Sequence, residues 1–193
     1  MKHIKFIALF VAVFSFCTVA SAQNDAEKFN SAYISWSPSW LSEPECGAAT
    51  FGNTVTLGWS QAYNLGTDPL FLEFGAALQY TKFNGTWNGV NAPFFYGVKM
   101  PVSFMCQIEG NNNFKFAPFV GVDLLANLRN EYKNASGSMT NADMRDLSAS
   151  VHAGFRCYFT RLFCGASYEY YWTKQLSTGS HMTLLNLTFG FTF

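Results

Sequence analysis

Six ionisable side chains occupy positions from which they could form a charged network inside a folded chain. They are Glu73, Lys99, Asp123, His152, Arg156 and Glu169. His152 and Glu169 are equally far from the dipeptide Thr160-Arg161, so a two-residue hairpin loop there would place them directly opposite each other. Buried single charges are costly, and a histidine facing a carboxylate across two strands therefore predicts a paired interior.

A second pair of opposite charges depends on another turn. If the turn over 109–113 is symmetric, Lys99 lies opposite Asp123, and Glu73 and Arg156 face the same interior. Together these side chains predict a paired polar network in the lumen of a barrel. A proton or ion pathway is the functional alternative for the same residues.

Catalysis would require more than these pairs. An activated serine needs a histidine within hydrogen-bond reach. Ser150 and His152 would share one strand face, and Ser180-His181 lies in a predicted loop. Adjacency of this kind is typical of a lumen pair and a loop dipeptide, so we predict no catalytic residues and no enzyme activity.

No cofactor and no metal are expected either. The chain has no CxxC motif, and its three histidines, His3, His152 and His181, are scattered. The same hairpin would place Cys157 opposite Cys164, within the usual range for a disulfide, and both a bridge and two free thiols stay open. Cys46 and Cys106 have no evident partner.

The elements that must position these residues are strands. Eight segments alternate between apolar and polar residues, at 29–37, 53–63, 70–81, 94–108, 114–128, 147–159, 162–172 and 182–193. In the last segment Leu185, Leu187 and Phe189 share one face, while Asn186 and Thr188 share the other. The pattern predicts an all-β fold, an eight-stranded antiparallel transmembrane up-and-down β-barrel with apolar residues toward lipid. Pro101 falls on an inner face and predicts a bulge or a weak point in its strand.

The connections alternate in length. Short turns are expected at 64–69, 109–113 and 160–161, and long loops at 37–52, 84–93, 129–146 and 173–181. Outer-membrane barrels have short periplasmic turns and long outer loops, so both termini are expected on the periplasmic side. The loops 37–52 and 129–146 are the expected contact surface for an extracellular ligand or surface partner.

The first residues read as a secretory signal peptide. Lys2 and Lys5 precede an apolar run over 6–16, and Ala20-Ser21-Ala22 is a small-residue cleavage site. We therefore expect a signal peptide over 1–22 and one barrel domain over 23–193. Lys and Arg number 12 and Asp and Glu number 12, so no basic face is available and nucleic acid is excluded as a partner.

Two stretches and the last residue carry a resemblance to a known family. Val98-Lys99-Met100-Pro101-Val102, followed by Phe116-Ala117-Pro118-Phe119-Val120-Gly121, resembles the porin-like outer membrane protein beta-barrel domain family of OmpA/OmpX type. The resemblance implies a protein of the bacterial outer membrane and cell envelope. It also implies that the terminal Phe193 is part of the signal read by the barrel assembly machinery.

The inner faces are rich in Gly, Ser, Thr and charge, which argues against a soluble lipocalin-like barrel with an apolar cavity. An eight-stranded interior is just wide enough for side chains to fill, so we expect a plugged, monomeric barrel in outer-membrane lipid. Its expected role is structural or surface interaction. Passive transport of small solutes and lipid modification are the alternatives. An aromatic girdle is expected from Trp36, Trp59, Tyr80, Tyr170 and Trp172.

Overall fold

The computed structural model describes residues 28–42, 49–66, 69–84, 86–87, 90–91, 94–111, 113–134, 137–140, 145–175 and 179–193. The predicted signal peptide over 1–22 lies outside the described residues. The strands are β1 (Lys28–Ser42), β2 (Ala49–Asn64), β3 (Leu70–Phe83), β4 (Thr86–Trp87), β5 (Val90–Asn91), β6 (Phe94–Cys106), β7 (Ile108–Asn111), β8 (Phe114–Asn134), β9 (Gly137–Thr140), β10 (Leu147–Phe159), β11 (Leu162–Tyr171) and β12 (His181–Thr192).

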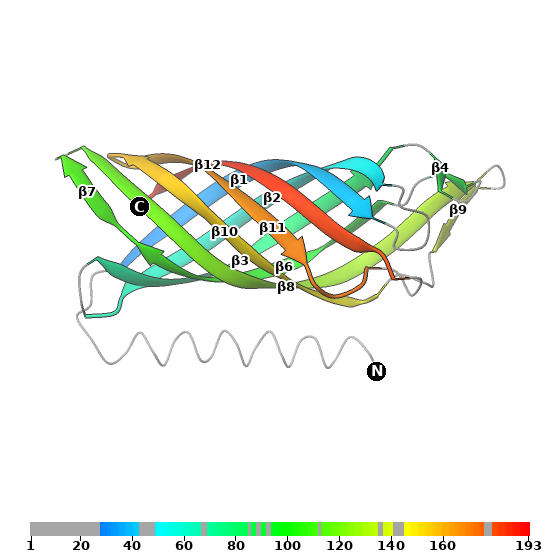
Figure 1. Ribbon diagram of the computed structural model, residues 1–193, viewed down its shortest axis with the longest axis horizontal. Helices are drawn as coiled ribbons and strands as arrows, with labels where there is room; N and C mark the ends of the chain where they lie inside the picture. The colour runs from blue at the N-terminus through cyan, green and yellow to red at the C-terminus, as the bar shows by residue number, and fades with distance from the viewer. Residues whose placement is uncertain are drawn as a thin grey trace.

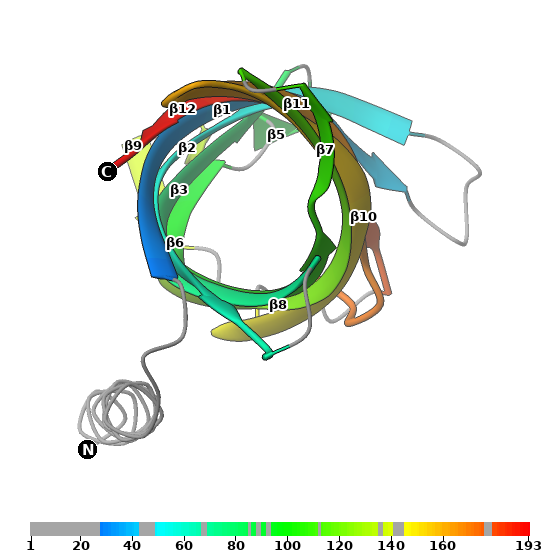
Figure 2. The ribbon, with the colours of Figure 1, turned by 90° about the vertical axis from the view of Figure 1, so that its left-hand side faces the viewer.

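Eight of the described strands close into one antiparallel barrel. The order β10-β11-β12-β1-β2-β3-β6-β8 is completed by pairing of β8 with β10, so the ring has no free edge (Figures 1 and 2). At one end Asn30 and Phe193 exchange both backbone hydrogen bonds, at 3.1 and 3.0 Å. This arrangement confirms the predicted eight-stranded antiparallel barrel. Within the described residues, no helix is long and apolar enough to span a membrane.

The two faces of the barrel wall differ as the alternation predicted. Leu57, Leu78 and Phe189 point outward and are 60, 61 and 62 % exposed. Ser60 and Thr81, on the opposite faces of their strands, are buried in the lumen. A continuous apolar outer face suits lipid and would be unfavourable in water. The lipocalin-like alternative requires the reverse orientation and is not observed.

The predicted long loops are shorter than expected, because strand pairing continues into them. β1 and β2 remain paired up to Ser42 and Ala49, where Trp40 and Phe51 make an edge-to-face contact at 6.2 Å. The predicted loop boundaries at 37–52 are therefore wrong. Within 84–93, β4 pairs with β5, and within 129–146 the long strand β8 pairs with β9. In each extension the backbone groups pair with a neighbouring strand. A polar composition does not prevent such pairing, so it was a poor guide to where the strands end.

Pro101 does not produce the predicted bulge. On one side, Phe74 pairs with Val102 and Ala77 with Lys99, so the register is the same before and after the proline. The irregularity in β6 lies instead between Tyr96 and Gly97, where pairing with β8 shifts. Pro101 is accommodated in a continuous strand with an interrupted ladder toward β3.

The hairpin joining β10 and β11 has a strained residue at its turn. Thr160 has a φ of 59°, and it is the only residue other than glycine with positive φ among the described residues. A β-branched side chain is disfavoured in this region of backbone conformation. The turn nevertheless pairs Phe159 with Leu162, which is the register expected of a two-residue loop.

Replacing Thr160 with asparagine should therefore stabilise the barrel by about 1 kcal/mol, because asparagine tolerates the left-handed region better than threonine. The measurement is a urea unfolding titration of the refolded protein in detergent micelles. Arg161→Asn at the neighbouring turn position is the matched control and should leave the unfolding midpoint unchanged. Equal midpoints for Thr160→Asn and the wild type would contradict the strain argument.

Candidate functional site

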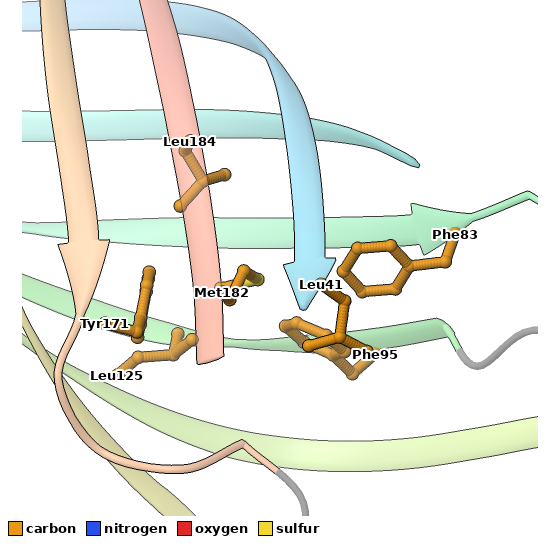
Figure 3. Close-up of a cluster of buried hydrophobic side chains, with 7 residues drawn as sticks. All are labelled: Leu41, Phe83, Phe95, Leu125, Tyr171, Met182 and Leu184. Atoms are coloured by element: carbon orange, nitrogen blue, oxygen red, sulfur yellow. The ribbon is translucent and has the colours of Figure 1, made fainter. Parts of the chain in front are cut away.

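The lumen is closed near the long-loop end by a cluster of large apolar side chains. Figure 3 shows these side chains, which come from β1, β3, β6, β8, β11 and β12. They are Leu41, Phe83, Phe95, Leu125, Tyr171, Met182 and Leu184, all almost fully buried. We call this set the upper plug. It packs large apolar side chains into the space that the barrel encloses there.

A second apolar cluster fills the lumen toward the short turns and the C-terminus. Its buried members are Ala62, Phe71, Met105, Ala117, Tyr158 and Phe163, with Phe29, Tyr33 and Phe119 packed against them. We call this set the lower plug. A plugged lumen was expected, but the apolar character of its two ends was not, because the inward faces were taken as polar throughout.

Between the plugs, Lys99 joins two carboxylates from different strands. Its Nζ lies 2.6 Å from Glu169 Oε2 and 3.4 Å from Asp123 Oδ2. β8 and β10 separate β6 from β11 in the wall, so the bond to Glu169 crosses the lumen. Ser150 Oγ lies 3.1 Å from Asp123 Oδ2 and 2.9 Å from Glu169 Oε1, and it donates its one hydroxyl proton to either carboxylate. The single positive charge of Lys99 is thus shared by two carboxylates at short distance.

The predicted opposition of Lys99 and Asp123 across the strands is wrong in register. The turn between β6 and β8 is not symmetric, and the strands pair Lys99 with Leu125 and Pro101 with Asp123. Lys99 therefore reaches Asp123 diagonally along the same face, a distance that a long side chain spans. By contrast, His152 does pair with Glu169 across β10 and β11.

The second ion pair lies closer to the lower plug. Arg156 Nη1 donates to Glu73 Oε1 and Oε2 at 2.8 and 2.9 Å, and Ser60 Oγ also donates to Glu73. The guanidinium group lies 4.8 Å from the ring centroid of Phe119 and 5.3 Å from that of Phe163. Arg156 thus connects the charged layer to the aromatic side chains beneath it.

His152 is bound on both ring nitrogens. Its Nδ1 lies 2.7 Å from Asp123 Oδ2, and its Nε2 lies 2.8 Å from Ser103 Oγ. Ser103 and His152 belong to β6 and β10, and between them on β8 is Gly121, which pairs with both. A Cβ atom at Gly121 would collide with His152 Nε2 and with the Val102 carbonyl oxygen. The absent side chain is what lets Ser103 and His152 meet.

The sequence analysis missed Ser103 and considered Ser150 as the partner of His152. In the structure, Ser150 binds carboxylates and His152 binds Ser103. The expected symmetric turn would have placed Ser103 opposite Phe119, whereas the observed register places it opposite Gly121. Ser180 and His181 do not form a pair of this kind, since His181 Nδ1 lies 3.1 Å from the Tyr171 carbonyl oxygen.

The charged layer surrounds a cavity of about 60 Å³. All six ionisable side chains of the predicted network line it, together with Ser103. The space has room for a few water molecules, which polar walls of this kind hold well. Asp123 Oδ1 is buried and has no protein hydrogen-bond partner among the described residues, so one such water would satisfy it. No group of three or more His, Cys, Asp or Glu in the described ranges is arranged to hold a metal ion.

The three cysteines of the described residues, Cys106, Cys157 and Cys164, lie on the outer face of the barrel, away from this site, and Cys46 lies outside the described residues. Cys157 and Cys164 are paired in register across β10 and β11, and both are free thiols in the structure, as is Cys106. Residues paired in register on antiparallel strands have Cα atoms at a separation that a disulfide can span.

We expect mild oxidation of the folded barrel in detergent to join Cys157 to Cys164 within one chain. The measurement is the number of thiols that react with a maleimide after denaturation, before and after oxidation. Cys106→Ser should leave the loss of two thiols unchanged, and Cys157→Ser should abolish it. Retention of both thiols after oxidation would contradict the expectation.

Comparison with solved structures identifies the fold. The structure is similar to that of Neisserial surface protein A, with a TM-score of 0.58 and 15 % identity, over 85 % of this chain and 97 % of that one. It is also similar to Ail, the attachment invasion locus protein of Yersinia pestis, with a TM-score of 0.54 and 15 % identity, over 86 % of this chain and 99 % of that one. No family model and no curated protein matches the sequence.

The fold is therefore the closed eight-stranded antiparallel β-barrel that these small bacterial outer-membrane proteins have. At 15 % identity, the similarity shows the fold, and the role has to be argued from the residues of this chain. The resemblance to OmpA/OmpX-type barrels is confirmed at the level of this fold.

Proposed function

We propose that this chain is an integral outer-membrane protein that makes contacts at the cell surface through the long-loop end of its barrel. The observation that carries the proposal is the filled lumen. Two apolar plugs enclose a charged layer whose ion pairs cross the interior. A barrel with a filled lumen is better suited to hold the long-loop end at the membrane surface than to let solutes pass.

The long-loop end has the structure that a display surface needs. β1 and β2, β4 and β5, and β8 and β9 continue as paired strands within the ranges 37–52, 84–93 and 129–146. Figure 1 shows β4 and β9 at the end of the barrel opposite β7 and the C-terminus. Paired strands hold a contact surface in place better than unpaired segments do. An extracellular ligand or surface partner would bind there.

The orientation and the biogenesis follow the same proposal. The short turns and both ends of the chain face the periplasm, and the long-loop end faces outside. The barrel functions as a monomer in outer-membrane lipid. Phe193, which is 61 % exposed beside the closing pair with Asn30, is the residue that the barrel assembly machinery reads.

The test uses protease cleavage sites in the full-length chain, expressed in a bacterium with an outer membrane. One site is inserted between 135 and 136 at the long-loop end, and a matched site is inserted after Gly66 in a short turn. In intact cells only the first should be cleaved, and in permeabilised cells both. The membrane fraction should also migrate differently on gels before and after boiling. Cleavage after Gly66 in intact cells would overturn the orientation, and a soluble protein without the shift would overturn the membrane assignment.

Passive transport is the second candidate, because the cavity is polar. It is tested by reconstituting the protein in planar lipid bilayers. A closed barrel should give no stable conductance steps, and regular steps at physiological salt would favour transport over surface contact. Lipid modification is the third candidate, tested by the mass of lipid A after expression. We propose that it does not occur, because Ser150 binds carboxylates, and Ser103, the serine bound by His152, is buried inside the barrel and away from lipid.

A further inference from the structure

Ser103, His152 and Asp123 are joined by two hydrogen bonds, and we call this set the relay. It has the geometry of an activated nucleophile, and the proposed surface role does not require it. Asp123 is a carboxylate and only accepts hydrogen bonds, so His152 must donate to it from Nδ1–H over 2.7 Å. When the imidazole is neutral, Nε2 is then the acceptor, and Ser103 Oγ, which lies 2.8 Å away, is placed to donate to it. Nucleophile, base and orienting carboxylate are thus in sequence, as general-base catalysis by histidine requires.

The fold positions all three groups rigidly. They project from the neighbouring strands β6, β8 and β10, and Gly121 leaves open the space through which the serine and the histidine meet. Ser103, Asp123 and His152 are 3, 1 and 7 % exposed, so water competes little for these hydrogen bonds. Lys99 and Arg156 line the same cavity, and each of them is paired with a carboxylate.

We propose that Ser103 is a reactive nucleophile that accepts acyl groups from small esters in the lumen. Ser103 Oγ bonds to the carbonyl carbon while its proton passes to His152 Nε2. The bond from that carbon to the alcohol oxygen then breaks, and the leaving oxygen takes the proton, which leaves an acyl ester on Ser103. A water oxygen then bonds to the acyl carbon while one of its protons passes to the same imidazole. The bond from that carbon to Ser103 Oγ breaks, Oγ takes the proton back, and the carboxylic acid leaves.

The cavity sets the class of substrate. A cavity of about 60 Å³ suits an acetyl-sized acyl group better than the long acyl chains of lipids. This activity goes beyond the proposed surface role and is separate from lipid modification. If it is found, the expectation that the chain has no enzyme activity is wrong.

Ser60 provides a control within the same molecule. Like Ser103 it is a buried lumen serine on a strand that lines the cavity, but its hydroxyl donates to Glu73, which is already paired with Arg156. A paired carboxylate is a poor general base compared with an oriented neutral imidazole. Reactivity caused by access alone would be the same at both serines, whereas reactivity caused by the relay is confined to Ser103.

The experiment treats the folded, full-length barrel in detergent with methanesulfonyl fluoride, which is small and uncharged. Ser103 Oγ forms a bond to sulfur, the S–F bond breaks, and fluoride leaves with the serine proton as HF. Peptide mass spectrometry should find the methanesulfonyl group on Ser103 and not on Ser60. An unlabelled Ser103, or equal labelling of both serines, would overturn the proposal.

A variant and a substrate complete the test. His152→Gln, verified as folded by its heat-modifiable migration, should slow the labelling of Ser103 by about 100-fold or more, because it removes the base. If this variant does not fold, the comparison of Ser103 with Ser60 in the wild type still decides. With p-nitrophenyl acetate, either acetylated Ser103 or continuing release of nitrophenol that Ser103→Ala abolishes supports the proposal, and the absence of both overturns it.

Discussion

Replacing Lys99 with methionine is expected to destabilise the folded barrel by about 3–5 kcal/mol, because it leaves buried carboxylates without their cation. Lys99 bonds Glu169 at 2.6 Å and lies 3.4 Å from Asp123. In the network it is one of two permanent cations, the other being Arg156, which is paired with Glu73. Methionine fills a similar volume, so the loss measures charge compensation more than packing.

The measurement for Lys99→Met is the free energy of unfolding in urea, with the protein in detergent micelles. Lys82→Met is the matched control, because Lys82 is an exposed lysine on β3, and its replacement should change the free energy little. Adding Glu169→Gln to Lys99→Met should recover part of the loss, since Asp123 keeps His152 while the other carboxylate is neutralised. A loss no larger than that of the control would show that the lumen is solvated well enough to hold the charges unpaired.

The outward faces of the barrel were predictable because lipid imposes a strict alternation. Leu185, Leu187 and Phe189 stand on one face of β12, and all three are exposed on the outside of the barrel. A strand slipped by one residue would turn this whole set into the lumen, so only one assignment is compatible with the membrane. The strand ends were less predictable, because a polar segment such as 37–42 pairs as well as an apolar one when a partner strand is present.

The interior was predictable only where turn length fixed the register. The dipeptide Thr160-Arg161 leaves a single pairing, and His152 indeed faces Glu169. The turn between β6 and β8 allows more than one, and the assumption of symmetry displaced Lys99 from its true partner Leu125. The same error in register is why the contact between Ser103 and His152 was not predicted, since it depends on both residues being paired with Gly121.

A filled lumen was expected, but the apolar side chains that form the two plugs were not predicted, for a different reason. Phe71, Phe95 and Tyr171 occupy inward positions near the ends of strands whose outward positions are also apolar, so alternation carries no signal there. Which large side chains fill the lumen depends on how six strands converge on one space. The strands converge in this way only in the closed barrel, so the sequence of a single strand does not show which side chains meet in the lumen.

The second large effect is expected at the pair of Arg156 and Glu73. Arg156→Met should also cost about 3–5 kcal/mol, because Glu73, which is 3 % exposed, would keep only the hydrogen bond from Ser60. The variant also loses the cation–π contacts with Phe119 and Phe163. Arg161→Met at the exposed hairpin turn is the matched control and should be nearly neutral.

A double-mutant cycle separates the pair from its surroundings. Glu73→Gln alone should destabilise the barrel. The double variant with Arg156→Met should cost clearly less than the sum of the two single changes, because it buries no unpaired charge, whereas each single variant does. Unfolding in urea gives all four free energies, and additive costs would mean that the two groups do not depend on each other. The same variants should remain closed in planar bilayers, because the upper plug near Leu41 and Phe95 lacks contact with this pair and still fills the lumen. Conductance in Arg156→Met would assign the closure to the ion pair and not to the plugs.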